Sequence, residues 1–104
     1  MLSLPDIASL CASSDRGERV AGFICLGVLI GGGIPLSDLT RLTAVLELGV
    51  RDPESRVRFR AAEAVGCSPL MLNRFRTTLR HLSTGDPNLA VREITAILAQ
   101  EQRI

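Results

Sequence analysis

The chain of 104 residues contains no tryptophan, no tyrosine and no lysine, and its aromatic residues are three phenylalanines. All 12 basic residues are arginine, and 11 acidic residues bring the formal net charge to +1. A chain without stacking aromatics or a strong positive charge is poorly equipped to bind nucleic acid or sugars. Its core must be built mainly from aliphatic side chains.

Residues that perform catalysis or bind metals are also scarce. His81 is the only histidine, so a histidine-based triad or metal cluster has no second imidazole. The odd number and wide spacing of Cys11, Cys25 and Cys67 indicate reduced, packed thiols rather than disulfides or a zinc site. We therefore expect no catalytic residue, no cofactor and no metal, and we predict that the chain is not an enzyme.

One uncharged stretch has to be weighed against a membrane span. Residues 20–37 carry no charge, but the run ends in three consecutive glycines at residues 31–33 and in Pro35. Because a spanning helix needs about 20 apolar residues, a buried helix followed by a turn is the better interpretation. The first residues lack the basic and long apolar segments of a signal peptide. These features predict a cytoplasmic protein without a membrane segment.

A short pattern occurs three times along the chain. It consists of an aspartate, a valine five residues later and an alanine-rich or apolar run. Its second and third copies begin at Asp52 and Asp86, an offset of 34, and a fainter copy begins at Asp15, at an offset of 37 from Asp52. Such periods are typical of stacked helical hairpins. We predict one all-α domain over residues 1–104 with three units, 1–33, 34–66 and 67–104, and six helices.

The second unit shows how each hairpin is expected to form. Ser37 is predicted to cap its first helix, and Asp52 with the following proline to end that helix and start the next. Gly66 is predicted to close the second helix in a left-handed conformation. The apolar positions fall on one stripe of each helix. The stripes are Leu39, Leu42, Leu46 and Val50 in the first helix, and Val57, Ala61, Ala64 and Val65 in the second.

Residues 52–66, Asp-Pro-x-x-x-Val-Arg-x-x-Ala-Ala-Glu-Ala-Val-Gly, resemble the second half of a HEAT repeat. They are closest to the short bacterial HEAT-like repeats that also occur in phycobilisome bilin lyase subunits. The resemblance implies a short right-handed α–α superhelix, or solenoid. It also implies a structural ladder in which an aspartate caps its helix and an arginine bonds to a neighbouring turn. The residues given these roles are Asp52, Arg58, Asp86 and Arg92, with capping alone for Asp15.

The arginines are concentrated in the middle of the chain. Residues 51–80 hold seven arginines and three acidic residues. Arg56, Arg60 and Glu63 share the helix stripe opposite the predicted buried face, while Arg76 and Arg80 lie four residues apart on the next helix. We expect these five residues to form a basic protein-interaction surface.

Counting by the repeat offset places four apolar residues at positions equivalent to Arg60 and Glu63. They are Phe23 and Leu26 in the first unit and Ile94 and Ile97 in the third. Terminal units of a solenoid normally need polar outer faces, because no neighbour covers them. These residues are therefore predicted to contact another chain, and a homodimer is the simplest arrangement.

The function that fits these observations best is a non-catalytic scaffold that presents a helical surface to a protein partner of unknown identity. Two alternatives remain open. The resemblance permits an accessory subunit of a bilin lyase- or isomerase-like enzyme. The central arginines permit weak binding of anions or nucleic acid, although the composition disfavours nucleic acid.

Overall fold

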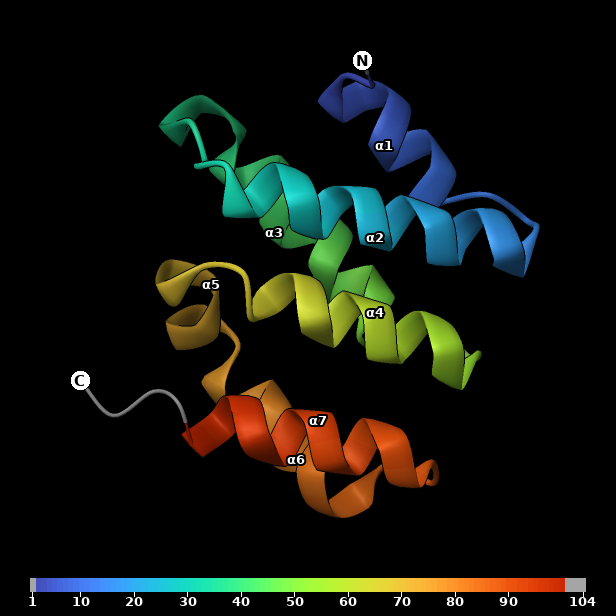
Figure 1. Ribbon diagram of the computed structural model, residues 1–104, viewed down its shortest axis with the longest axis vertical. Helices are drawn as coiled ribbons and strands as arrows, with labels where there is room; N and C mark the ends of the chain where they lie inside the picture. Colours follow the sequence, from blue (N-terminus) through green and yellow to red (C-terminus); the bar gives the residue numbers. More distant parts are fainter. Residues whose placement is uncertain (1, 101–104) are drawn as a thin grey trace.

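The computed structural model describes residues 2–100, which form seven α-helices and one 3₁₀ turn and contain no strand (Figure 1). The elements are α1 (Leu4–Cys11), α2 (Arg16–Gly31), η1 (Leu36–Asp38), α3 (Leu39–Gly49), α4 (Ser55–Val65), α5 (Pro69–Arg74), α6 (Arg76–Gly85) and α7 (Leu89–Gln100). The predicted all-α class is confirmed. The end of the third predicted unit, residues 101–104, lies outside the described residues.

The prediction of six helices is wrong, because the helix expected between residues 68 and 82 is broken at Phe75. This residue has φ −99° and ψ 12°, which ends α5 and precedes α6. Its backbone stays bonded on both sides, to Met71 at 2.9 Å and to Leu79 at 2.8 Å. The Phe75 ring is buried, so the break keeps the side chain in the core while α5 and α6 take different directions (Figure 1).

Three helices lie side by side across one face of the molecule. α2, α4 and α7 all run in the same direction, with α2 against α4 and α4 against α7 (Figure 1). A second set packs on them: α1 on α2, α3 on α4, and α6 on α7. Each second helix of a predicted unit therefore has a first helix against it.

The predicted apolar stripes are buried where these helices meet. Val57 and Val91, at equivalent positions of the second and third units, are both fully buried. Also buried are Leu42, Leu46, Val50, Ala61, Ala64 and Val65. Helical periodicity thus identifies most of the core of the second unit correctly.

Two local predictions in the second unit are wrong. Ser37 does not cap a helix, because it lies within the 3₁₀ turn η1 and α3 begins at Leu39 without a side-chain cap. Gly66 has a right-handed φ of −66°, and the one positive φ among the described residues, 111°, belongs to Gly33. The left-handed conformation that favours glycine is therefore found in the turn after α2 and not at the end of α4, where the sequence suggested it.

α2 contains most of the uncharged stretch that begins at Val20, and the chain leaves the helix at the glycine run. Within residues 2–100, no helix has the combination of length and apolar character that crossing a membrane requires.

Gly49 of α3 lies close against α2 and α4. A Cβ at this position would lie 2.4 Å from the Phe23 ring and 2.7 Å from the Cβ of Ala61. We expect Gly49→Ala to lower the free energy of unfolding by about 2 kcal/mol, because neither buried neighbour has room to move. Urea unfolding measures this loss.

Gly31→Ala is the matched control for Gly49→Ala. Gly31 ends α2, and a Cβ added there would meet no neighbouring atom within 4 Å. At this position, replacing glycine with alanine should raise the free energy of unfolding by no more than about 0.5 kcal/mol. Equal effects at the two glycines would contradict the close packing at Gly49.

Candidate protein-interaction surface

Two arginine–aspartate pairs connect successive units. Arg19 on α2 donates through Nε and Nη2 to both carboxylate oxygens of Asp52, at 2.9 and 3.2 Å. Arg58 on α4 bonds to Asp86 in the same way, at 2.7 and 3.0 Å. In both cases Nη1 donates to carbonyl oxygens in the loop that precedes the arginine's own helix. Each arginine therefore ties its own loop to the loop of the next unit.

Both pairs are largely shielded from water. The side chains of Arg58 and Asp86 are 12% and 2% exposed. Burial by itself raises the pKa of the Asp86 carboxyl. Hydrogen bonds from Arg58 and the backbone N–H of Asn88, with the charges of Arg58 and Arg92, outweigh burial and hold that pKa below its ordinary value. Asp86 is therefore ionised at neutral pH and paired in the geometry that favours arginine.

The structure changes the alignment of the first unit. Ser13 there occupies the place of Asp52: its Oγ accepts from the N–H two residues later, and its carbonyl oxygen accepts from Arg19, six residues later. Asp52 makes the same two bonds, to the N–H of Glu54 and to Arg58. The offset between the first and second units is therefore 39 rather than 37.

The predicted capping role is correct for one aspartate of the three. Asp15 caps α2, with its carboxylate accepting from the N–H of Glu18 at 2.9 Å. Asp52 and Asp86 do not cap helices. Each accepts from the N–H two residues later, in a turn ahead of the helix, and receives an arginine from the preceding unit. In the third unit, Asn88 makes the cap-like bond, to the N–H of Val91.

The prediction that Phe23 and Leu26 form an interaction surface is wrong. Phe23 is 1% exposed and Leu26 is 0% exposed, and both belong to the core of this chain. With the offset of 39 they correspond to Ala62 and Val65, which are also buried. No second chain is needed to cover them, so this argument for a homodimer through α2 fails.

The five residues predicted as one basic surface lie on two sets of helices. Arg56 and Arg60 are on α4, where Arg60 donates to Glu63 at 2.8 Å and lies over the Phe59 ring at 5.7 Å. Arg76 and Arg80 are on α6, which packs against α7. Arg76 donates to Asn73 within its own segment of the chain.

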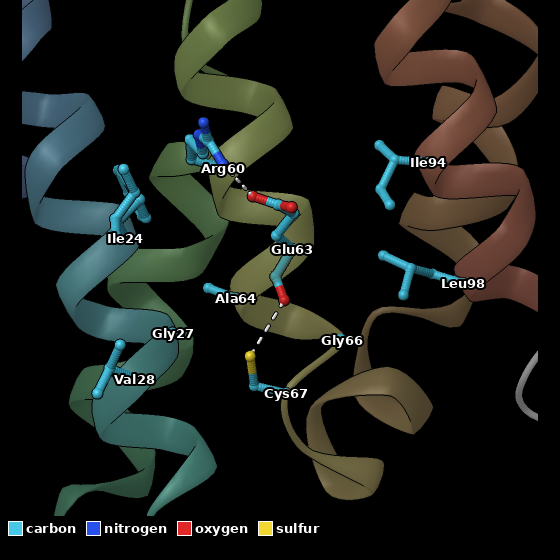
Figure 2. A pocket seen from close by; sticks show the side chains of 11 residues that line it. Ile24, Gly27, Val28, Arg60, Glu63, Ala64, Gly66, Cys67, Ile94 and Leu98 are labelled. Carbon is cyan, nitrogen blue, oxygen red and sulfur yellow. Dashed lines mark hydrogen bonds and ion pairs between the residues drawn. The ribbon is translucent and has the colours of Figure 1, made fainter.

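The face of α2, α4 and α7 carries an open groove of about 420 Å³ (Figure 2). Ile24 and Val28 of α2 line one side, and Ile94 and Leu98 of α7 line the other. The Arg60–Glu63 pair and Cys67 lie between them (Figure 2). Ile94, which the sequence places on an interaction surface, is partly buried at the edge of this groove.

Several exposed side chains on this face are apolar. Val28 is 75% exposed and Ile24 is 45% exposed. Ile97, which the sequence places on the interaction surface, is 55% exposed on α7. The sequence pattern misses Ile24 and Val28. The correct offset of 39 makes them equivalent to Glu63 on α4 and to Cys67, which follows the end of that helix.

The thiols of Cys67, beside the groove, and of Cys11, at the end of α1, both have a raised pKa. Burial and the charge of Glu63 raise the pKa of the Cys67 thiol, so it is protonated at neutral pH. Burial, with a contribution from Cys25, raises the pKa of Cys11 to about 12. Within residues 2–100, no three His, Cys, Asp or Glu side chains are grouped so as to hold a metal ion.

Comparison of the chain with protein-family models, with curated proteins and with solved structures finds no match. The chain itself defines an all-α protein in which α2, α4 and α7 lie side by side on one face and a further helix packs against each of them (Figure 1).

Proposed function

We propose that this chain is a short right-handed HEAT-like solenoid that acts as a non-catalytic protein-binding module. Support comes from the recurrence of one interaction: Arg19 and Arg58 each bond to the aspartate of the next unit. The parallel course of α2, α4 and α7 also fits a solenoid of three units (Figure 1). A rigid stack of this kind provides a fixed surface for a partner.

The binding surface is the outer face of α2, α4 and α7, and the observation that carries the proposal is its apolar groove. Ile24 and Val28 remain exposed beside Ile94, although the charged pair at the centre keeps the groove polar in one place. Exposed apolar side chains that gather around a hollow are typical of a protein contact. The partner supplies apolar side chains to both sides of α4.

The charge of the surface favours an acidic residue in the partner. A second hollow shares Arg60 with the groove and is lined by the exposed Arg56. Glu63 already neutralises Arg60, whereas the structure shows no carboxylate bonded to Arg56 among the described residues. An acidic side chain beside the apolar segment would pair with Arg56.

Selection of binders from a random peptide library tests this surface. Peptides that bind the purified protein should carry apolar residues with an acidic residue nearby. We expect Val28→Glu to weaken their binding at least about tenfold, because it buries a charge in the contact. Leu36→Glu is the control, since Leu36 is 85% exposed in η1 and does not line the groove. Equal losses in the two variants would contradict the assignment of the surface.

A second pair of variants tests the charge preference. Arg56 and Arg80 are both charged residues with access to solvent, but only Arg56 lines a hollow on this face. Arg56→Glu should lower peptide affinity about threefold to tenfold, with an effect that decreases as salt is added, and Arg80→Glu should leave it unchanged. If Arg80→Glu had the larger effect, the partner would contact α6 rather than the groove.

A further inference from the structure

Arg92 makes one of the two kinds of bond that Arg19 and Arg58 make. Its Nη1 donates to the carbonyl oxygen of Asp86 at 2.7 Å, as Nη1 of Arg58 donates to the carbonyl oxygen of Asp52. In Arg19 and Arg58, the Nε and Nη2 edge then binds an aspartate of the next unit. Within residues 2–100, the same edge of Arg92 has no carboxylate partner.

Two residues of α7 on the same stripe of the helix as Arg92 are less buried than their counterparts in α2 and α4. Ala62 and Val65 of α4 are fully buried, and so are their counterparts Phe23 and Leu26 in α2. The equivalent residues of α7, Ala96 and Ala99, are only partly buried. Two positions that are closed in the first two units are thus partly open in the third. Because both side chains are small, a helix could approach α7 closely there.

The loop before α2, at the other end of the row of helices, has no aspartate in the position of Asp52 and Asp86. Ser13 takes the place of the aspartate in the first loop and makes the same turn, but its hydroxyl carries no charge. Asp15, the nearest aspartate, is exposed and accepts from the N–H of Glu18 as the cap of α2. The Glu18 carboxylate accepts a hydrogen bond from the Ser13 hydroxyl. Both acidic side chains near the first loop are thus bonded within α2 and its cap, and a second copy of this chain offers Arg92 no aspartate in the ladder position.

We propose that the α7 edge, formed by Arg92, Ala96 and Ala99, is a docking site for one more helical hairpin of the same kind. The loop of that hairpin supplies an aspartate, which pairs with Nε and Nη2 of Arg92 as Asp86 pairs with Arg58. Its second helix packs beside α7 as α7 packs beside α4. The occupant is thus recognised by its aspartate and by its close helical contact.

A duplication in the chain tests this docking site. A copy of residues 67–100 is inserted directly after Gln100, which keeps every natural residue. The copied aspartate then follows Asp86 at the same offset at which Asp86 follows Asp52. The extended protein should unfold in a single transition at a higher temperature than the natural chain, because the added hairpin covers the open edge. A separate transition for the added hairpin would overturn the proposal.

Arg92→Ala, made in both chains, separates docking from a local role. In the extended chain it should increase the equilibrium constant for unfolding about 100-fold, as expected when a shielded aspartate loses its arginine. In the natural chain the increase should be less than about threefold. Changing the copied aspartate to alanine in the extended chain should reproduce the larger effect. Equal effects of Arg92→Ala in the two chains would overturn the proposed pairing.

Sedimentation velocity of the natural chain tests the choice of occupant. The proposal predicts no association that depends on Arg92 as the concentration rises, because Ser13 replaces the aspartate at the other end. Association that Arg92→Ala abolishes would show that a second copy occupies the edge, and would contradict the proposal.

Discussion

Replacing Arg58 with alanine is expected to lower the free energy of unfolding by about 3 kcal/mol. The substitution leaves the Asp86 carboxylate, whose side chain is 2% exposed, without the two hydrogen bonds and the charge that compensate its burial. It also removes the bond from Nη1 to the carbonyl oxygen of Asp52. Urea unfolding at neutral pH measures the loss.

Arg56→Ala is the control, because Arg56 is an arginine on the same helix that makes no comparable pair among the described residues. Its effect should stay within about 0.5 kcal/mol of zero. A double-mutant cycle with Asp86→Ala isolates the contribution of the pair. The sum of the losses in unfolding free energy of the two single variants should exceed the loss in the double variant. Additive losses would mean that Arg58 and Asp86 do not stabilise each other.

The stabilisation by this pair should depend on pH in a defined direction. The pKa of Asp86 in the folded protein lies below its ordinary value, so the contribution is fully present above the unfolded-state pKa of about 3.9. It is lost as the pH falls through the folded-state pKa. The difference in stability between the wild type and Arg58→Ala should therefore become smaller below about pH 4. A difference that grows in acid would contradict this sign.

Phe23→Ala is expected to cost about 4 kcal/mol, on the order of the loss seen when a large buried aromatic is truncated. The Phe23 ring is 1% exposed and lies beside Gly49 and Ala61, neither of which has a side chain long enough to fill the space. For a domain of this size, the melting temperature should fall by roughly 15 to 30 °C. Calorimetry measures both quantities.

Ile24→Ala is the matched control for Phe23→Ala. Ile24 is the next residue on α2 and is 45% exposed, so its truncation should cost less than about 1 kcal/mol. In the interpretation from sequence alone, Phe23 lies on an interaction surface. A residue exposed in the single chain would lose little stability on truncation. A small effect at Phe23 together with a large one at Ile24 would support the alignment with an offset of 37 instead.

The second and third units can be predicted from the sequence because their copies carry the same residues. Asp52 and Asp86 mark corresponding loops, and Val57 and Val91 are buried at corresponding positions. The break at Phe75 cannot be predicted in this way, since its apolar neighbours keep helical spacing through the bend. The Phe75 ring is buried at the break, a tertiary contact that the repeat pattern does not contain.

The sequence pattern misaligns the first unit because serine replaces aspartate in its loop. Ser13 makes the turn with its hydroxyl, while Asp15, two residues later, performs the separate task of capping α2. Asp15 therefore looks like the repeated aspartate in sequence. Arg19 is the residue that reveals the correct offset of 39, since it makes the pair in the first unit that Arg58 makes in the second.

This two-residue error also explains the wrong part of the predicted interaction surface. On a helix, a shift of two residues turns a side chain through about 200°, so buried and exposed positions exchange. The offset of 37 thus places Phe23 and Leu26 outside and overlooks Ile24 and Val28. The separation of Arg76 and Arg80 from the arginines of α4 depends on the packing of α6 against α7, which the sequence pattern does not show.

Nuclear Overhauser effects between neighbouring second helices test the stacking most directly. Gly27 of α2 faces Ala64 of α4, and Gly66 at the end of α4 faces Leu98 of α7. The stack predicts cross-peaks from the Gly27 α-protons to the Ala64 methyl group and from the Gly66 α-protons to the Leu98 methyl groups. If both sets were absent while the helices remained folded, α2, α4 and α7 would not lie side by side in this register.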